Sequence, residues 1–503
     1  MKTFARDALY IPIKRVTDDQ YEKVQTRFEK DVYKEEKTCE ACDYFSERPC
    51  DVCDSCPNYE GKVTMHSIVK KANGKKYLRL PFGSKAKVER IFGDVTIVNK
   101  NKDVPMHRPI KFTGELRENQ KTAVKKMIEC EYGVLKSPPR SGKTVMGACF
   151  VSRIQQKTLI LAAQKEWLDN FHETFVGSDT QKALTDIRHK RIGFPKTLED
   201  FEKFDVSLVT YQKFLRPKGK KLLKKISKMF GIILVDEVQT AGAKEFAYIL
   251  GQFHARYKIG LSGTPERKDS KEYIFYNLLG PVFYQNKVEQ LRPRLECVVT
   301  NFGGKMPQQW TYIVNKIEKD PKRLRLIADT AIADVKAGHL VFIPLARVAV
   351  IKALAKAINQ IRGKDIAAAF HGGVHKDLRK RIIQEARDYK IKIVVGNTRL
   401  ISTGTNIPRA SMLYQVSPSS NIPKAEQRFA RVLTPHEGKP QPVFKYFLDD
   451  IDVVRSCLRK EHWHVVIPRF RPKMTGETKE ILDHYFKNKK RPTGVNDYSG
   501  GYI

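Results

Sequence analysis

The residues best suited to chemistry begin with the stretch SPPRSGKT at 137–144, which follows an apolar β-type run and precedes a helical stretch. Backbone N–H groups around Ser141 and Gly142, together with the amino terminus of the helix, could cradle phosphate oxygens. The Lys143 ammonium would neutralise the outer phosphates, and the Thr144 hydroxyl would bind magnesium. The stretch starts with serine where the simplest pattern has glycine, which exchanges one small residue for another.

A second motif, IILVDEVQ at 232–239, places two carboxylates at the end of an apolar run. Packing explains them poorly, because an unpaired buried acid costs free energy. Asp236 can hold the water shell of a magnesium ion, and Glu237 can polarise an attacking water. The competing interpretation is a strand that ends in a solvated acidic turn, and the phosphate-type loop upstream weakens it. The two motifs together predict one magnesium-dependent phosphate site.

From residue 111 onward, short apolar runs alternate with helical stretches, which is the pattern that would position such motifs. Buried parallel strands have continuous apolar runs because helices cover both faces of their sheet. The first set of candidate strands is 132–136, 158–162, 206–210, 232–236 and 257–261. After a break near 281–293, the second set is 295–300, 339–343, 366–370, 391–396, 412–416 and 444–448. The fold class predicted is α/β, with two tandem units.

Residues 1–110 predict a smaller accessory domain that contains β-structure. The Asn-Gly pair at 73–74 lies between the β-prone runs 63–69 and 77–80, which is a strong hairpin signal. Basic residues flank this hairpin, so it could grip duplex nucleic acid or act as a wedge, although a solvated basic turn is also possible. They are Lys70, Lys71, Lys75, Lys76 and Arg79. The stretch MHRP at 106–109 is predicted to be a linker.

Five of the nine cysteines lie in an insert of this domain at 39–56. They are Cys39, Cys42, Cys50, Cys53 and Cys56. Two C-x-x-C pairs suit tetrahedral zinc, which takes four thiolates, so four of these five would be the ligands of a structural zinc site. An iron–sulfur cluster and free thiols remain less favoured alternatives. The other four cysteines are scattered singly, which indicates a reducing compartment.

The composition limits the partners and the compartment. Of 503 residues, 93 are Lys or Arg and 56 are Asp or Glu, which gives a net charge of +37. Such an excess predicts a polyanionic partner, either nucleic acid or an anionic membrane surface. No apolar run approaches the roughly 18 residues needed to span a bilayer, and the opening MKTFARDALYIPIKR lacks the apolar core of a signal peptide. We therefore expect a cytoplasmic chain, or one in the host cytoplasm if viral, that is neither secreted nor membrane-spanning.

The densest basic segment is 213–228, with eight basic residues in sixteen and no acidic one. A phosphate track for DNA is the favoured interpretation, and it assigns DNA contacts to Lys220, Lys221, Lys224 and Lys225. A basic amphipathic helix on a membrane and a merely solvated helix face are the alternatives.

Further stretches follow in the order typical of the superfamily 2 helicases and translocases, which the chain resembles over about 111–450. They are Leu116-Arg117 with Gln120, TLILAAQKEW at 158–167, VTYQ at 209–212, LSGTP at 261–265, the run at 339–343, His371-Gly372 with Arg379, NTRLISTGTNIP at 397–408, and QRFAR at 427–431. The compact core with a basic amino-terminal domain is most similar to the phage UvsW-type branch-migration helicases.

The resemblance implies two RecA-like domains with ATP and magnesium in the cleft between them. Arg117, Gln120 and Gly404 would then join the phosphate loop in binding the nucleotide. In the last motif Gln427, Arg428 and Arg431 would complete catalysis, with Arg431 the first choice and Arg428 the second for the arginine at the γ-phosphate. The family usually has a further arginine where this chain has Thr434.

The resemblance also assigns residues to coupling and to strand binding. Ser262, Gly263 and Thr264, with Gln239, would link hydrolysis to domain movement. The strand contacts implied are Thr210, Tyr211, Gln212, His371, Gly372 and Thr398. Contacts to the nucleic-acid backbone carry little sequence information, as a translocating motor requires.

We therefore predict a nucleic-acid-stimulated ATPase that unwinds or branch-migrates forked and junction DNA in replication, recombination or repair. The domains expected are 1–110 (accessory), 111–285 (first RecA-like), 286–450 (second RecA-like) and 451–503 (carboxy-terminal extension). A duplex translocase or an RNA remodeller without strand separation, and a nucleic-acid-binding scaffold with an inactive ATP site, are the alternatives. DNA is the favoured partner, RNA is less favoured, no membrane is expected, and a monomer is favoured.

Overall fold

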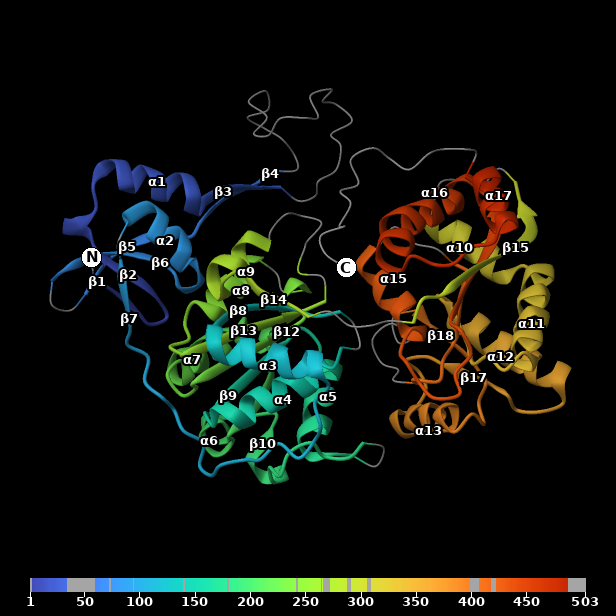
Figure 1. The fold of residues 1–503 in the computed structure, drawn as a ribbon, viewed down its shortest axis with the longest axis horizontal. Coiled ribbons are helices and arrows are strands. Elements are labelled where there is room, and N and C mark those ends of the chain that lie inside the picture. Colours follow the sequence, from blue (N-terminus) through green and yellow to red (C-terminus); the bar gives the residue numbers. More distant parts are fainter. Residues whose placement is uncertain are drawn as a thin grey trace. The chain divides into compact units, whose positions relative to one another are not determined.

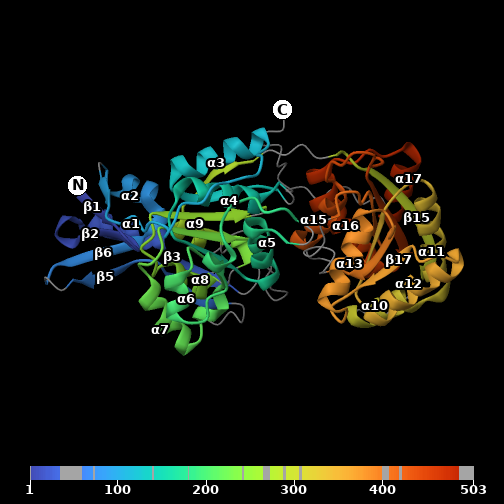
Figure 2. The same ribbon diagram turned by 90° about the horizontal axis from the view of Figure 1, so that it is seen from below.

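The computed structural model describes residues 2–33, 59–71, 74–93, 95–138, 141–178, 181–240, 243–263, 265, 272–286, 291–304, 309–398, 407–417 and 422–486. The chain divides into two compact units, Met1–Val288 and Glu289–Ile503 (Figure 1). Each unit contains one parallel sheet with helices on both of its faces (Figure 2). The predicted pair of tandem α/β units is therefore confirmed.

The first unit begins with a small mixed sheet of strand order β5-β6-β2-β1-β7. Its strands are β1 (Lys2–Ala5), β2 (Ala8–Pro12), β5 (Ser67–Lys70), β6 (Lys76–Pro81) and β7 (Thr96–Asn99), and the helices packed on it are α1 (Asp18–Phe28) and α2 (Lys85–Phe92). Helix α1 starts after Thr17, whose hydroxyl accepts a hydrogen bond from Gln20 N–H while the Gln20 side chain accepts one from Thr17 N–H. This reciprocal pair satisfies N–H groups that the first helical turn leaves open.

The predicted hairpin is present as strands β5 and β6, whose register pairs Ile68 with Leu78 and Lys70 with Lys76, whereas Asn73 of its predicted turn lies outside the described residues. The predicted single run at 63–69 is divided, because β4 (Tyr59–Thr64) ends before β5 begins and pairs instead with β3 (Glu29–Tyr33). Met65, which lies between the two strands, packs against the core of the small sheet and against the core of the larger neighbouring sheet.

The amino-terminal sheet is attached to the rest of the first unit through polar contacts that are partly or fully buried. Arg79 donates to the Gly251 carbonyl oxygen at 3.0 Å and pairs with Asp7 at 3.1 Å. Lys258 is buried with its ammonium 4.2 Å from the centre of the Phe82 ring, and burial lowers its pKa to about 7. These contacts make the small sheet part of the first unit.

The stretch 106–109, predicted to be a linker, is packed along the first unit. The backbone N–H of His107 donates to Asp205 Oδ1 at 2.7 Å, and its ring Nδ1 lies 2.8 Å from the same oxygen. Asp205 is completely buried and also accepts from Arg191, while Ile110 is buried in the adjacent core. A fully buried carboxylate with three donors fixes the path of the chain here.

The parallel sheet of the first unit has the strand order β10-β11-β9-β12-β13-β8-β14. Its strands are β8 (Tyr132–Lys136), β9 (Thr158–Ala162), β10 (Ile192–Gly193), β11 (Val206–Thr210), β12 (Ile232–Asp236), β13 (Tyr257–Ser262) and β14 (Val282–Gln285). Side chains alternate between two cores: Ile232 and Leu234 face one, and Ile233 and Val235 face the other. The first core includes α3 (Glu118–Cys130), α4 (Lys143–Ile154) and α5 (Lys165–Val176), and the second includes α6 (Leu198–Lys203), α7 (Pro217–Ile226), α8 (Ala243–Leu250) and α9 (Glu272–Leu279).

The parallel sheet of the second unit has the order β15-β20-β19-β16-β18-β17. Its strands are β15 (Arg294–Gly303), β16 (Val341–Leu345), β17 (Ala367–Phe370), β18 (Ile393–Asn397), β19 (Met412–Gln415) and β20 (Val443–Asp450). One face packs on α11 (Pro321–Lys336) and α12 (Val348–Arg362), and the other on α13 (Lys376–Arg387) and α15 (Ile422–Phe429). Helix α10 (Trp310–Lys319) packs with residues that follow the last strand.

The carboxy-terminal extension is largely helical as far as residue 486. Helix α16 (Asp452–Glu461) runs into a π-helix, His462–Phe470, and α17 (Gly476–Tyr485) follows. Leu458, Val466 and Leu482 are buried in the core of the second sheet. The extension is therefore part of the second unit, and its apolar face explains why it folds.

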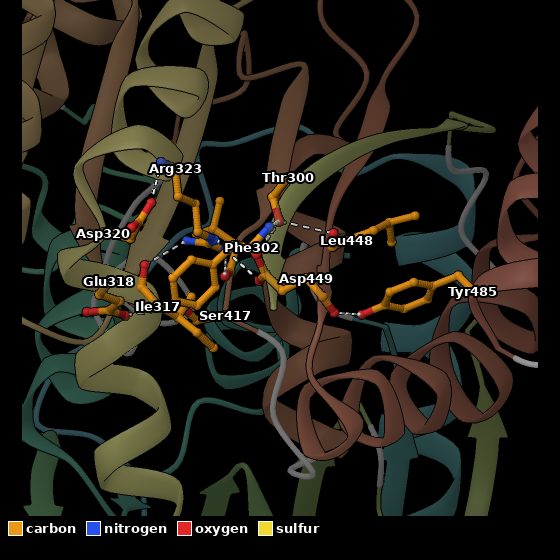
Figure 3. Close-up of polar contacts among 11 residues, drawn as sticks. Thr300, Phe302, Ile317, Glu318, Asp320, Arg323, Ser417, Leu448, Asp449 and Tyr485 are labelled. Atoms are coloured by element: carbon orange, nitrogen blue, oxygen red, sulfur yellow. Dashed lines mark hydrogen bonds and ion pairs between the residues drawn. The ribbon is translucent and has the colours of Figure 1, made fainter. Parts of the chain in front are cut away.

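A buried ion pair ties helix α11 to the end of strand β20 (Figure 3). Arg323 donates through Nε to Asp449 Oδ1 at 2.7 Å and through Nη2 to Oδ2 at 2.9 Å, and both side chains are completely buried. The remaining guanidinium donors bind the carbonyl oxygens of Ile317 and Val416. The guanidinium thus joins four separate segments of the second unit.

Replacing Arg323 with methionine should lower the free energy of unfolding by about 3–5 kcal/mol, because it leaves the Asp449 carboxylate buried without its cation. Arg325 provides the matched control, since it lies two residues further along the same helix and its pair with Asp329 is exposed. The Arg325→Met change should cost about 0.5 kcal/mol or less. Urea unfolding curves measure both values, and equal effects of the two changes would contradict the importance of the buried pair.

Among the described residues, no helix combines the length and the apolar character needed to cross a membrane.

Candidate nucleotide and nucleic-acid site

The phosphate-type loop connects β8 to α4, the context that the sequence predicts. Gly142 has φ +83 and immediately precedes the first residue of α4, Lys143. A Cβ atom at Gly142 would lie 2.4 Å from Gln120 Nε2, so both the backbone conformation and the space require glycine. Ser141 is buried, and Thr144 lies in the first turn of the helix, where N–H groups are open to an anion.

Gln120, predicted to contact the nucleotide base, makes both of its amide contacts within the chain. Its Nε2 donates to the Ser141 carbonyl oxygen at 2.8 Å, and its Oε1 accepts from Arg117 N–H at 3.0 Å. Gln120 is buried, so it links the start of α3 to the phosphate loop. Its role toward adenine, and that of Arg117, remain predictions.

The two carboxylates lie beside the lysine of the loop. Lys143 Nζ is 3.3 Å from Glu237 Oε1 and 3.4 Å from the Ser137 carbonyl oxygen. Burial, and then the charge of Glu237, raise the pKa of Asp236 to about 7, and Lys143 opposes that rise. Glu237 has φ +47, an unusual conformation for a residue other than glycine and one that occurs often at functional sites.

These residues fit a nucleotide with a divalent cation. Asp236 and Glu237 are adjacent carboxylates, one at the end of a buried strand, and Lys143 is the cation that contacts Glu237. A hard divalent cation prefers oxygen ligands, and the Thr144 hydroxyl and the Asp236 carboxylate supply them. Magnesium bound there would neutralise charge on the phosphates and on Asp236.

A chain of hydrogen bonds leads from Glu237 to the end of strand β13. Gln239 Nε2 donates to Glu237 Oε2 at 2.7 Å, and Ser262 Oγ donates to Gln239 Oε1 at 2.6 Å. Ser262 is completely buried, and its carbonyl oxygen accepts from Ser137 N–H at 2.7 Å. Gly263 follows in a bend, whereas Thr264 lies outside the described residues. Two of the residues predicted to couple hydrolysis to movement, Gln239 and Ser262, thus connect Glu237 to the phosphate loop.

Sequence reasoning missed two buried groups that support the phosphate loop through hydrogen bonds, the hydroxyl of Ser137 and the amide of Asn286. Ser137 Oγ donates to Ser141 Oγ at 2.6 Å, and Asn286 Nδ2 donates to Ser137 Oγ at 2.9 Å. The replacement of the first glycine of the loop by serine was the signal for the first. Asn286 follows an edge strand far along the chain and gave no signal.

The predicted strand contacts of the first unit follow strand β11. Thr210 is partly exposed, and Gln212 is exposed with its Nε2 donating to the Ala163 carbonyl oxygen at 3.0 Å. Tyr211 is buried, and its hydroxyl donates to the Thr240 carbonyl oxygen at 3.2 Å. Tyr211 therefore supports the loop after the carboxylates, and Thr210 and Gln212 are the more accessible pair.

The basic segment 213–228 forms α7 and its flanks. Gly219 allows this helix to approach the preceding turn, because a Cβ atom there would lie 1.9 Å from the Lys213 carbonyl oxygen. Leu223 and Ile226 are buried, whereas Lys220, Lys221, Lys224 and Lys225 are exposed. The helix thus presents a row of positive charge to solvent.

The end of that segment lies close to the amino-terminal sheet. His254 N–H donates to the Ser227 carbonyl oxygen at 2.9 Å, and His254 Nε2 is 3.8 Å from Asp7. Burial lowers the pKa of His254, and Lys258, Lys228 and Arg6 add to this effect against the opposing charge of Asp7. In the hairpin Lys75 and Lys76 are exposed. His254 therefore connects the end of the basic segment to the amino-terminal sheet.

In the second unit, the predicted strand contacts lie at the carboxyl ends of β17 and β18. His371 is buried, its Nδ1 accepts from Gly373 N–H at 3.2 Å, and burial lowers its pKa. Gly372 is exposed, and Thr398 Oγ1 donates to the Leu345 carbonyl oxygen at 3.5 Å. Gly404, predicted to bind the nucleotide, lies outside the described residues.

The two arginines of the last motif have different environments. Arg428 is buried on α15 and pairs with the buried Glu461 of α16 at 2.7 Å, and Gln415 donates to the other oxygen of that carboxylate. Arg431 is partly exposed in the short helical turn that follows, and Gln427 is partly exposed on α15. The geometry gives Arg428 a partner inside the second unit and leaves Arg431 the more accessible of the two.

The five cysteines proposed as zinc ligands, Cys39, Cys42, Cys50, Cys53 and Cys56, lie outside the described residues. Within the described part of the chain there is no group of three or more His, Cys, Asp or Glu side chains that could hold a metal ion. Zinc therefore remains a prediction from cysteine spacing.

Two family models match the chain, and together they cover more than half of it. The model described as the res subunit of type III restriction enzymes matches residues 113–267, and the helicase conserved C-terminal domain matches residues 323–434. The first match contains the phosphate loop, both carboxylates and the Ser262 strand. The second contains the motif with Arg431.

Curated relatives are similar at low identity. The chain is 26% identical over 313 residues to the protein named helicase D10 of Escherichia phage T5, which covers 62% of this chain and 66% of that protein. It is 26% identical over 182 residues to the DNA 3'-5' translocase XPB2 of Sulfurisphaera tokodaii, which covers 35% and 37%. The chain thus spans less than two thirds of the length of either relative.

Solved structures are similar in fold. A fragment of an HsdR subunit of a type I restriction enzyme from Vibrio vulnificus aligns with a TM-score of 0.50 at 15% identity, covering 82% of this chain and 77% of that one. The T4 UvsW structure aligns over 89% of this chain and 90% of that one at 18% identity, with a TM-score of 0.39. Since both motor-domain models match in order and each falls on one parallel-sheet unit, the chain belongs to the superfamily 2 helicases and translocases.

Proposed function

We propose that this protein is a nucleic-acid-stimulated ATPase that translocates on DNA and separates or branch-migrates its strands. The observation that carries the proposal is the chain of contacts from Lys143 through Glu237 and Gln239 to Ser262. It joins a phosphate-binding lysine, a carboxylate able to polarise water and a residue on the neighbouring strand. A site built only to bind nucleotide needs no such connection.

In this mechanism the phosphate loop holds ATP through backbone N–H groups and Lys143. Magnesium, held through Thr144 and Asp236, supplies charge neutralisation at the phosphates. Glu237 orients and polarises the attacking water, and Gln239 holds the Glu237 carboxylate in place. A change in the position of Glu237 would then reach Ser262, because the Gln239 side chain is hydrogen-bonded to both.

DNA is favoured as the polymer because part of the positive charge excess is concentrated on exposed surfaces of the first unit. The exposed lysines of α7 and the basic hairpin both lie on the first unit. Phosphate contacts of this kind bind without sequence preference. The relative from Sulfurisphaera tokodaii is named as a DNA translocase, which supports the same choice.

The α7 lysines should govern the salt dependence of DNA binding. The variant has four lysines changed to glutamine together: Lys220, Lys221, Lys224 and Lys225. Its plot of log K against log salt should have a negative slope that is shallower by about 3–4, since each lost contact to a duplex phosphate reduces the magnitude of the slope by about 0.9. Fluorescence anisotropy with duplex DNA over a salt series measures this slope. A matched variant with Lys322, Lys336, Lys356 and Lys364 changed to glutamine, all exposed on the second unit, should keep the parental slope. Equal slopes in all three proteins would mean that the α7 lysines do not contact DNA and form only a solvated helix face.

The polymer and the reaction are tested by a substrate panel. ATP turnover and strand separation are compared on single-stranded DNA, blunt duplex, forked DNA, four-way junctions and RNA. Stimulation together with separation on forks or junctions supports the proposal. Stimulation by duplex without separation supports a translocase, and preferential stimulation by RNA supports an RNA remodeller. Binding without any turnover would support a scaffold with an inactive site.

A further inference from the structure

Asn286 lies between the phosphate loop and the point where the chain leaves the first unit. It directly follows β14, is completely buried, and donates its backbone N–H to the Lys136 carbonyl oxygen at 2.7 Å. Two residues later, between Val288 and Glu289, the first unit ends and the second begins. A force that the second unit exerts along the chain therefore reaches Asn286 before any other described residue of the first unit.

The side chain of Asn286 grips the phosphate loop itself. Its Nδ2 donates to Ser137 Oγ at 2.9 Å, and Ser137 Oγ donates onward to Ser141 Oγ at 2.6 Å. Ser137 and Ser141 are both completely buried, so neither bond competes with water. Ser141 directly precedes Gly142, the residue whose conformation shapes the loop.

The same serine connects to the catalytic carboxylate by a second route. Ser137 N–H donates to the Ser262 carbonyl oxygen, and the Ser262 side chain is joined through Gln239 to Glu237. Asn286 is thus one end of a continuous polar chain that is buried from Asn286 to Ser262 and ends at the partly exposed Glu237. Each link is a hydrogen bond of 2.9 Å or less.

Stability alone explains this asparagine poorly. Its Oδ1 is buried and has no hydrogen-bond partner among the described residues. A buried acceptor without a partner costs free energy, and leucine would fill nearly the same volume without that cost. Since only the Nδ2 group of the amide is hydrogen-bonded, we infer that Asn286 stabilises the present conformation of the phosphate loop. In another conformation of the loop, Oδ1 could accept a hydrogen bond.

We propose that Asn286 is a positioning residue that transmits movement of the second unit to the phosphate loop, and so couples DNA binding to ATP turnover. The inference rests on the proposed function, since it concerns the rate of that reaction. Asn286 acts through Ser137 and contacts neither the carboxylates nor Lys143.

The test uses the full chain with forked DNA and compares Asn286→Leu with Asn277→Leu. Asn277 is a buried asparagine of the same unit that accepts from Lys87 and lies outside the polar chain. We expect Asn286→Leu to keep the KM for ATP and the DNA-free kcat within about threefold of the parent, and to lower the factor of stimulation by DNA at least about fivefold. Asn277→Leu should lower the melting temperature and leave the stimulation factor unchanged.

Ser137→Ala gives an independent route to the same result, including the case where Asn286→Leu does not fold. It should lower the stimulation factor similarly, and the double variant should be no worse than either single one, because both changes interrupt one path. Full stimulation in Asn286→Leu, or in Ser137→Ala if the leucine variant fails to fold, would overturn the inference. A parental chain that DNA does not stimulate at all would overturn the proposed function and this inference with it.

Discussion

The Lys143→Ala variant should hydrolyse ATP at least about 1,000-fold more slowly than the parent chain while still binding DNA. Lys143 is the first residue of α4, and its ammonium lies 3.3 Å from Glu237. Its charge is needed most in the transition state, where negative charge spreads over the transferred phosphoryl oxygens. No other described lysine or arginine forms an ion pair with Glu237.

Three measurements separate this effect from unfolding. ATP turnover with saturating forked DNA gives the rate, anisotropy gives DNA affinity, and thermal melting gives stability. Lys165→Ala is the matched control, because Lys165 starts the neighbouring helix α5 and makes an exposed pair with Asp169. It should retain parental turnover. Substantial turnover in Lys143→Ala would contradict the motor interpretation of this loop.

The Arg431→Ala variant should lower turnover by about 1,000-fold or more with little change in melting temperature. The family resemblance implies that this arginine contacts the γ-phosphate, and its side chain is partly exposed in the structure. Its effect should fall on kcat, with the KM for ATP changed less, because the contact strengthens as charge develops.

Arg428→Ala should show the opposite pattern. It leaves the Glu461 carboxylate buried without its cation, which should lower the free energy of unfolding by about 3–5 kcal/mol. At a temperature where both variants are folded, Arg428→Ala should keep more of the parental kcat than Arg431→Ala. Equal losses of kcat at equal stability would mean that both arginines act at the γ-phosphate. In that case Arg428 would compensate for the family arginine that Thr434 replaces.

Much of the fold could be predicted because its signals are local. Strands such as β9 and β12 are buried on both faces and therefore have unbroken apolar runs, and the hairpin carries its own Asn-Gly turn. The short strands β1, β2 and β7 escaped prediction. Although β1 and β2 pair with each other locally, β1 also pairs with β7 and β2 with β6 across long stretches of chain, and β7 is partly exposed. Two-residue β10 has too few residues for any pattern.

The site divides in the same way. Motif order predicts that Lys143 and Glu237 lie together, and they do, although their roles remain predictions. Partners that come from distant elements could not be predicted. Arg428 gave no sign that Glu461 would pair with it, and Asn286 gave no sign that it would reach Ser137, because neither spacing nor periodicity indicates a contact between elements that are far apart in the sequence.

The attachment of the amino-terminal sheet changes how the chain can be divided. Sequence places a boundary at residue 110, yet His107 is bound to Asp205, Arg79 reaches Gly251, and Lys258 lies against Phe82. A fragment starting at 111 would lose the aromatic and acidic surroundings that cover a buried lysine. The sheet is therefore not a transferable module, because removing it would uncover the surface of the first unit on which it packs.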